Sequence, residues 1–234
     1  MASSPKISNL ASSLPLYRPL IINITLSPLS SKIVEESVAE FSRLPGIGKR
    51  TALRLVLHLL KSDKESSYRL GNALTRLHNE VKYCATCHNI SESDVCDICA
   101  DQSRDTQCLC IVEDLRDVIA IENTQQYRGY YHILGGIISP MDGIGPNDLN
   151  LPSMLDRLKD NRFKEIIIAL PATMEGETTS YFIYKKINQS ERKDLKFTSI
   201  ARGISVGSDL EFADEVTLGR SIIQRVPYEN SLIK

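Results

Sequence analysis

Several features that often decide the class of a protein are missing from this sequence of 234 residues. It contains no uninterrupted run of about 18 apolar residues, the length that a helix needs to span a membrane. No cysteine lies outside residues 84–110, whereas the disulfides of a secreted protein tie distant segments together. No internal repeat is visible. The sequence therefore favours a protein without membrane contact, in a compartment that keeps thiols reduced.

Acidic residues are absent from residues 1–30, a segment rich in Ser, Pro and Leu whose basic residues are Lys6 and Arg18. Its apolar stretch is short and is interrupted by Pro28. This composition predicts a disordered extension or a start site assigned too far upstream. A transit peptide, which is also poor in acids and rich in Ser, is the alternative. We expect ordered structure to begin near Ser31.

The charges are unevenly distributed, although the net charge is only −1. Residues 1–82 contain twelve basic and six acidic side chains, and the remaining residues contain 16 basic and 23 acidic ones. A basic first third predicts contact with a polyanion, and the alternative is an imbalance without a partner. A hydrophobic fraction of 42% and a charged fraction of 24% are typical of a globular protein with one large domain or a few small ones.

Apolar residues follow helical spacing in three stretches of the first third. The first stretch begins at Ser31, a predicted N-cap, and includes Val38. The sequence LPGIG interrupts the pattern before the second stretch, and the third stretch ends near Val81. Residues 31–83 are therefore predicted to form a small helical domain.

From residue 107 onward the pattern changes to strands separated by helices. The strand-like segments are 108–112, 130–134, 166–170 and 197–201, and the helical stretches lie near 114–124, 148–160, 177–188 and 217–224. This alternation predicts an α/β domain with a largely parallel sheet over residues 107–199, followed by a C-terminal region over residues 200–234. The predicted fold class is α+β in several parts: a helical hairpin domain, a cysteine knuckle and the α/β domain.

The segment FSRLPGIGKRTALRLVLHLL is the first motif with chemical meaning. Pro45 ends one helix, and Gly46 and Gly48 permit backbone angles that other residues avoid, so two helices can join in a tight turn. The free N–H groups that begin the second helix can then bind an anion. The pattern resembles the helix-hairpin-helix motif of DNA-binding proteins, and the alternative is a turn between packed helices. The predicted phosphate-binding residues, without base readout, are Gly46, Ile47, Gly48, Lys49, Arg50 and Arg54.

Two CxxC pairs are separated by eight residues, Cys84 with Cys87 and Cys96 with Cys99. Each pair places two thiolates on one tight turn, and two such knuckles complete a tetrahedron. Four sulfur ligands suit a structural Zn²⁺ ion and leave no open position for catalysis. Residues 84–99 are therefore predicted to be a zinc finger that binds one zinc per chain. The alternatives are a redox pair or two disulfides.

Other cysteines and histidines are predicted to have no ligand role. His88 could compete as a ligand because it follows the first pair directly, but four cysteines already suffice. Cys108 and Cys110 share one face of a predicted strand and are expected to fill core space. His58 and His78 fall within helical patterns and are expected to be surface or core residues.

Acidic residues follow two of the strand-like segments. Glu113 ends the first of these, and the other runs into the sequence PATMEGE. The region resembles the Toprim domain shared by topoisomerases, primases and certain nucleases, in which a Glu after the first strand works with a DxD pair after a later one. Here Pro171 and Thr173 stand at the positions of the two aspartates. The resemblance therefore implies no strand cleavage, and at most one weak Mg²⁺ site, formed by Glu113, Glu175 and Glu177.

The hairpin, the four-cysteine segment, the Toprim-like region and the stretch ARGISVGSDLEFADEVTLGRSI follow one another along the chain. Together with GGIISPMDGIGPNDL and LPATMEGETT they resemble the RecR family of bacterial recombination mediators over residues 31–226. The resemblance implies a non-enzymatic DNA-repair factor of the bacterial cytoplasm and nucleoid. It also implies homodimers or ring-like homotetramers that encircle DNA and act with RecO and RecF to load RecA on gapped single-stranded DNA.

The same resemblance implies two protein interfaces. A basic RecO surface would meet an acidic face of the Toprim domain, whose residues are Glu113, Asp117, Glu175 and Glu177. Residues 200–220, described in the family as Walker B-like, and the hairpin region would contribute to subunit contacts.

The alternative function is a metal-dependent nuclease or primase-like enzyme, suggested by the surviving acids. Turnover of DNA with Mg²⁺ or Mn²⁺ separates the two hypotheses, because a clamp predicts steep salt dependence without turnover.

Overall fold

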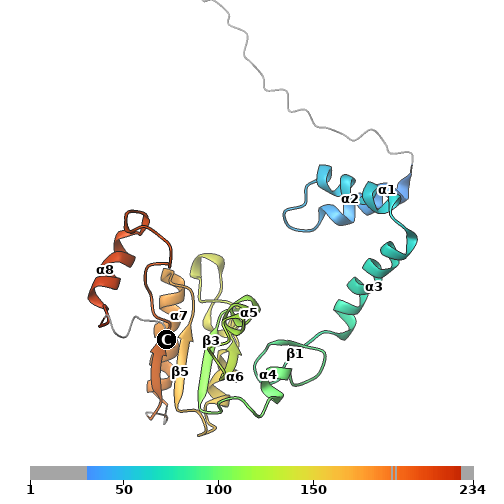
Figure 1. Ribbon diagram of the computed structural model, residues 1–234. Coiled ribbons are helices and arrows are strands. Elements are labelled where there is room, and N and C mark those ends of the chain that lie inside the picture. Colours follow the sequence, from blue (N-terminus) through green and yellow to red (C-terminus); the bar gives the residue numbers. More distant parts are fainter. Residues whose placement is uncertain (1–30, 191, 193, 228–234) are drawn as a thin grey trace, which may run out of the picture. The chain divides into compact units, whose positions relative to one another are not determined.

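The computed structural model describes residues 31–190, 192 and 194–227, so the predicted extension over residues 1–30 lies outside the described residues, as does the end of the predicted C-terminal region. The chain forms two compact units, of which the first ends at Ala73 and the second begins at Leu74. Figure 1 shows the helices and strands of both units coloured along the chain. No helix in these residues is long and apolar enough to cross a membrane.

The first unit is built on two helices that pack against each other, α1 (Lys32–Ser42) and α2 (Lys49–Lys61). Their core is small and centres on the buried residues Val38, Ala52 and Val56. Ser31 occupies the N-cap position of α1, but its side chain makes no capping hydrogen bond. The predicted helix is therefore confirmed, whereas Ser31 supports its first turn only through its backbone carbonyl, which accepts the N–H of Glu35 at 3.2 Å.

The third predicted helix is α3 (Lys64–Glu80), which continues across the boundary between the two units. Asp63 supports its first turn by accepting the N–H of Ser66 at 2.7 Å. None of its residues is buried, and Leu74 and Leu77 expose 57% and 60% of their surface. Helical spacing correctly predicts this helix, but spacing alone does not say what covers its apolar side.

The second unit begins with the cysteine segment. A short antiparallel ladder joins β1 (Lys82–Tyr83) to β2 (Ile90–Ser91), and α4 (Asp97–Ala100) follows. The first cysteine pair lies in the turn between the two strands, and the second pair lies at the start of α4 and within it. The ladder and the short helix therefore carry one pair each.

Four parallel strands form the main sheet of the second unit, in the order β4-β3-β5-β6. The strands are β3 (Cys108–Val112), β4 (Tyr130–Ile133), β5 (Glu165–Ala169) and β6 (Lys196–Ser199). The helices between them are α5 (Leu115–Asn123), α6 (Leu151–Arg157) and α7 (Met174–Asn188), and the 3₁₀ turns η1 (Pro140–Asp142) and η2 (Pro146–Asp148) precede α6. Parallel strands need such crossovers, and the predicted α/β domain with a parallel sheet is confirmed.

Alternate residues of the central strand β3 point into two separate cores. Leu109 and Ile111 belong to the core that contains residues of α6 and α7, whereas Cys110 and Val112 pack with Val118 of α5. Cys110 is buried, in agreement with the prediction. Cys108 is only partly buried, because it is the first residue of the strand and lies at the end of the sheet.

The helix α7 begins at Met174, earlier than the predicted start near residue 177. Thr173 causes this early start, because its Oγ1 accepts the N–H of Gly176 at 3.1 Å and so caps the helix. A Cβ atom on Gly176 would lie 2.0 Å from the carbonyl oxygen of Pro171, so only glycine allows this first turn to pack so closely. The acids on either side of Gly176 therefore belong to a helical turn.

The C-terminal region contains η3 (Leu210–Phe212) and α8 (Glu215–Ile223). Asp214 caps α8 by accepting the N–H of Thr217 at 2.9 Å. Ile200 donates its N–H to the carbonyl of Ile168 at 3.3 Å and so links the start of this region to β5. None of the residues of α8 is buried.

Candidate functional site

The turn between α1 and α2 uses its two glycines differently. Gly46 has a φ of +79°, in the left-handed region that favours glycine. Gly48 has a φ of −80° and an extended backbone, which any residue can adopt, so the predicted conformational need for glycine is wrong at this position. Gly48 is the N-cap of α2, and no side chain caps the helix there. The first N–H groups of α2 therefore remain open to an anion.

The helix α2 is basic along its length. Lys49, Arg50 and Arg54 are exposed, and the helix contains no acidic residue. The ion pairs on the neighbouring helical segments join other residues, Arg43 with Glu40 and Arg76 with Glu80. The predicted phosphate-binding side chains are therefore brought together on one helix without a carboxylate partner among the described residues.

A shallow groove of ≈ 400 Å³ runs along α2. The side chains that line it are Arg50, Leu53, Arg54, Leu57, His58 and Lys61. His58 and Lys61 are both exposed, and Lys61 lies outside the hairpin motif. His58 and Lys61 follow Arg54 by four and seven residues. This spacing predicts that all three share one side of the helix. Basic groups thus extend well beyond the turn.

The four cysteines of the two pairs converge. Their Sγ atoms all lie within 4.8 Å of one another, and the Cys87 and Cys96 sulfurs are 3.5 Å apart. A tetrahedral zinc with Zn–S bonds of about 2.3 Å separates its sulfurs by about 3.8 Å, so the donor set fits this ion. Cys84, Cys87 and Cys96 are buried, and none of the six cysteines of the chain forms a disulfide. The site is closed and suits a structural metal.

The immediate surroundings of the cysteines support the same assignment. The backbone N–H of Cys96 donates to the sulfur of Cys84 at 3.3 Å, a contact that favours a thiolate. His88 has a φ of +65°, and its Nε2 hydrogen-bonds with the hydroxyl of Ser153 at 2.7 Å. This geometry gives the His88 ring a partner in α6 and leaves the four cysteines as the candidate ligand set.

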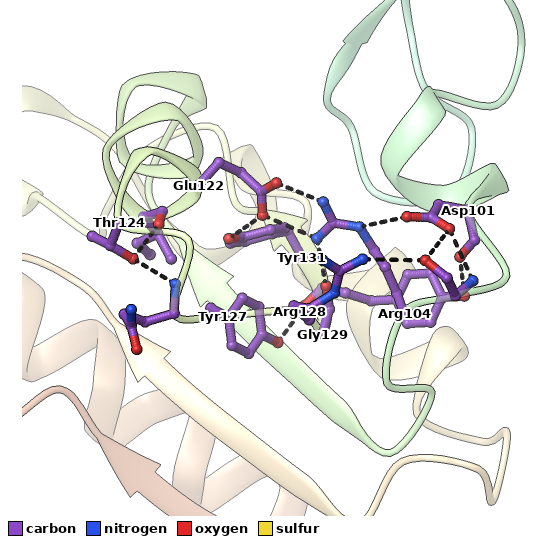
Figure 2. Close-up of polar contacts among 12 residues, drawn as sticks. Asp101, Arg104, Glu122, Thr124, Tyr127, Arg128, Gly129 and Tyr131 are labelled. Carbon is purple, nitrogen blue, oxygen red and sulfur yellow. Dashed lines mark hydrogen bonds and ion pairs between the residues drawn. The ribbon is translucent and has the colours of Figure 1, made fainter. Parts of the chain in front are cut away.

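Arg104 attaches the end of the cysteine segment to the sheet domain (Figure 2). Its guanidinium donates to the carboxylate of Glu122 on α5 at 2.9 and 2.5 Å and to the carbonyl of Gly129 at 3.0 Å. The Tyr131 hydroxyl donates to the same carboxylate at 2.7 Å. The hydrogen bond from Arg104 lowers the pKa of Glu122, and the Arg104 side chain is only 12% exposed. Arg104 and Glu122 therefore form an internal ion pair.

The strand β4 is the second attachment point. The carbonyl of Cys87 accepts the N–H of Ile133 at 2.9 Å, and the hydroxyl of Tyr130 donates to the carbonyl of Asp101 at 3.2 Å. Hydrogen bonds therefore join both ends of the cysteine segment to one strand. A metal bound by the four cysteines would order this segment and so fix the backbone groups that bind the sheet domain.

Two of the predicted acidic residues have structural partners at the start of α5. The carboxylate of Asp117 accepts the N–H groups of Glu113 and Asp114, both at 3.1 Å, and completes a capping box with Asp114. Burial raises the pKa of Glu113, and the charges of Asp117 and Asp114 raise it further. Glu113 is partly buried, so it is less available to a partner than its position after a strand suggests.

The other two predicted acids lie in the first turn of α7. Glu177 forms an ion pair with Arg202, a residue for which the sequence carried no signal, because the two are distant along the chain. Asp117 and Glu177 line one groove of ≈ 1050 Å³ beside the ends of β5 and β6, whereas Glu113 and Glu175 are not among its lining residues. Within the described ranges, the cysteines are the one group of three or more His, Cys, Asp or Glu side chains placed to hold a metal.

Comparison with protein families divides the chain into four consecutive matches. Residues 34–78 match the family described as RecR, helix-hairpin-helix, and residues 81–101 match the four-cysteine zinc finger domain of RecR. Residues 107–201 match the Toprim domain, and residues 203–226 match RecR, C-terminal. The order of these matches is the order in which the hairpin, the cysteines and the sheet occur in the structure.

Curated relatives cover nearly the whole chain. The Recombination protein RecR of Flavobacterium johnsoniae is 56% identical over 202 residues, which are 86% of this chain and 97% of that protein. The protein of the same name from Bacteroides thetaiotaomicron is 53% identical with the same coverage of both chains. That of Amoebophilus asiaticus is 51% identical over 199 residues, 85% of this chain and 98% of the relative.

Proposed function

This chain belongs to the RecR family of DNA-binding recombination proteins, and on that premise we propose that it is a non-enzymatic clamp and adaptor in DNA repair. The proposed task is to hold gapped single-stranded DNA in the bacterial cytoplasm and nucleoid, and to act with RecO and RecF in the loading of RecA. The observation that carries the proposal is the basic side of α2, which has no acidic partner among the described residues and begins at a helix N-terminus that none of their side chains caps.

The chemistry of α2 supports binding to phosphate and not to bases. Backbone N–H groups and the charges of Lys49, Arg50 and Arg54 recognise the DNA backbone, which is the same for every sequence. We infer that binding is independent of sequence and falls steeply as salt rises. A homodimer or a ring-shaped homotetramer would place several such helices on one DNA molecule and increase the effective affinity.

The residues of the Toprim domain favour a role as an adaptor over a role as a nuclease. Two-metal cleavage needs several carboxylates that converge on the cations. Here Thr173 caps α7 and Pro171 packs against Gly176, so the two positions that would bear aspartates hold structural residues. Asp117 is occupied in capping α5. The acids that remain would bind Mg²⁺ at most weakly, and we propose that they serve to bind a basic protein surface.

The decisive experiment for DNA binding changes Lys49, Arg50 and Arg54 together to Ala. The expected result is loss of binding to single-stranded DNA at moderate salt, with the slope of log K against log salt smaller by about 2, since each phosphate contact contributes about 0.7 on single strands. The matched control changes Arg43, Lys64 and Arg69 to Ala, which removes the same charge from the same helical region. Equal binding by both triple variants would show that α2 is not the DNA site.

The adaptor role has two separate tests. Incubation of the protein with labelled DNA and Mg²⁺ or Mn²⁺ should give no cleavage or primer synthesis, and turnover that disappears in Glu113→Gln would establish the rival enzyme.

A pull-down with RecO should weaken when Glu175 and Glu177 are changed to Lys. Because Glu177 also pairs with Arg202, the Arg202→Gln variant is the control for loss of that ion pair alone. Unchanged capture of RecO by the double variant would remove these residues from the interface.

A further inference from the structure

Arg157, the last residue of α6, has an unusual environment for a cation. Its Nη1 donates to the carbonyl of Tyr131 at 2.5 Å. Its Nε and Nη2 atoms are buried and have no hydrogen-bond partner in the part of the chain that the structure describes. No carboxylate pairs with Arg157 within those residues either, whereas Arg104 pairs with Glu122. Two buried donors and a positive charge are therefore left without a counterpart, which is costly unless a further group supplies one.

The side chains around Arg157 do not supply that negative charge. The guanidinium carbon lies 5.4 Å from the centre of the Phe163 ring and 5.8 Å from that of Tyr130. His88 and His132 lie close together, with ring centres 5.3 Å apart. Burial lowers the pKa of His132 to about 3. Neither imidazole can carry the negative charge that would pair with Arg157.

The cysteine segment lies at the same edge of β4. Residues i and i+2 of a strand direct their backbone polar groups to the same side, so the carbonyl of Tyr131 and the N–H of Ile133 face the same neighbour. Arg157 binds the first of these groups, and the carbonyl of Cys87 binds the second. The Arg157 guanidinium and the backbone of the first cysteine pair therefore bind neighbouring groups on one edge of β4.

We propose that Arg157 is the counter-charge of the zinc centre. One Zn²⁺ ion with four thiolates carries a formal charge of about −2, and a buried site of this kind is stabilised by N–H donors and cations that surround the ligands. The guanidinium of Arg157, at the same edge of β4 as the first cysteine pair, would supply the cation. Zinc binding and the attachment of the cysteine segment to β4 would then be coupled through one side chain of α6. The inference rests on zinc occupying the four cysteines, which metal analysis of the unaltered protein tests separately.

The test compares Arg157→Gln with the matched control Arg162→Gln. The guanidinium of Arg162 lies over the same two rings, 5.4 Å from the centre of Tyr130 and 4.9 Å from that of Phe163, but it pairs with Asp160. Zinc affinity of the full chain is measured by competition with a chromophoric chelator, and Co²⁺ replaces zinc for absorption spectroscopy. Arg157→Gln should weaken zinc binding by about 10- to 100-fold and shift the sulfur-to-cobalt charge-transfer band. Arg162→Gln should change neither.

A third variant separates the charge from packing and covers the case that Arg157→Gln does not fold. Arg157→Lys keeps the charge and the aliphatic stem but loses the planar fork. It should fold with zinc, and its affinity should lie within a few-fold of that of the unaltered protein. Zinc binding by Arg157→Gln at the affinity of the unaltered protein would overturn the proposal, as would a loss in Arg157→Lys as large as that in Arg157→Gln. A zinc-free unaltered protein would instead refute the metal assignment.

Discussion

The charged side chains of α2 and those of the second unit are used in opposite ways. On α2 the basic groups are exposed and have no acidic partner among the described residues, and the core beneath them contains three buried residues. In the second unit some charges are committed internally, as in the ion pair of Arg104 with Glu122. Unpaired charge is available to bind a ligand, whereas paired charge holds the fold. The difference predicts which substitutions reduce stability and which reduce binding.

The largest effect on the second unit should come from the metal site. Cys96→Ala removes one of four thiolates, and structural zinc contributes on the order of 10 kcal/mol in zinc-finger peptides. We expect loss of bound zinc and a much lower melting temperature for the second unit, measured by metal analysis and circular dichroism. Cys108→Ala is the control because Cys108 is outside the cluster. Retention of zinc and an unchanged melting temperature in Cys96→Ala would contradict the assignment.

The next largest effect concerns the close contact at the start of α7. Gly176→Ala should lower the free energy of unfolding by about 2 to 4 kcal/mol, because its Cβ would clash with the carbonyl of Pro171. Gly219→Ala in α8 is the matched control, since nothing lies within 4 Å of its added Cβ. That variant should be more stable by roughly 0.5 to 1 kcal/mol. Chemical denaturation of the two variants measures the difference in their free energies of unfolding. Equal values would show that Gly176 does not lie tightly against the Pro171 carbonyl.

The internal pair of Arg104 with Glu122 should be worth more than an exposed ion pair of the same type. Arg104→Gln leaves Glu122 partly buried without its cation, and the expected loss is roughly 2 kcal/mol. Arg43→Gln breaks an exposed pair with Glu40 and should cost less than about 0.5 kcal/mol. Because Arg104 lowers the pKa of Glu122, the stabilisation is present above the unfolded pKa and is lost as pH falls through the folded one. Denaturant titrations at neutral and acid pH test both statements.

A smaller effect on the free energy of unfolding should develop gradually as the pH is lowered. Burial lowers the pKa of His132 to about 3, against about 6.5 for an unfolded chain. Between these values the unfolded chain binds the additional proton, so the free energy of unfolding decreases as pH falls, by about 1 kcal/mol per pH unit. His132→Gln should show a shallower dependence between pH 6.5 and 5 than the exposed control His78→Gln. Identical slopes for the two variants would mean that His132 does not remain neutral when folded.

The smallest effect on stability is predicted for α2, where the effect on binding is large. Arg54→Ala should change the free energy of unfolding by less than about 0.5 kcal/mol, because the side chain is exposed and has no acidic partner among the described residues. The same change should reduce the salt slope of DNA binding by about 0.7. A stability loss comparable to that of Arg104→Gln would erase the contrast between the two regions.

Local patterns predicted much of this molecule. Helical spacing predicted α1, α2 and α3, the strands β3 to β6 lie where apolar runs predicted them, and the cysteine spacing predicted the metal cluster. Local patterns could not reveal pairs between distant residues. Arg202 with Glu177 and Arg104 with Glu122 depend on how the elements pack, and so does the environment of Arg157. Thr173 was interpreted as a lost metal ligand, and only the structure shows its role as a helix cap.

The hydrogen bond between Cys87 and Ile133 has a consequence for the behaviour of the chain in a crowded cell. The strand β4 lies at the border of the sheet, and its outward N–H would otherwise be free to pair with a strand of another molecule. The ordered cysteine segment covers that N–H. Chelation or oxidation of the thiolates would uncover it, so a metal-starved or oxidised protein should aggregate through intermolecular strand pairing before its helices melt.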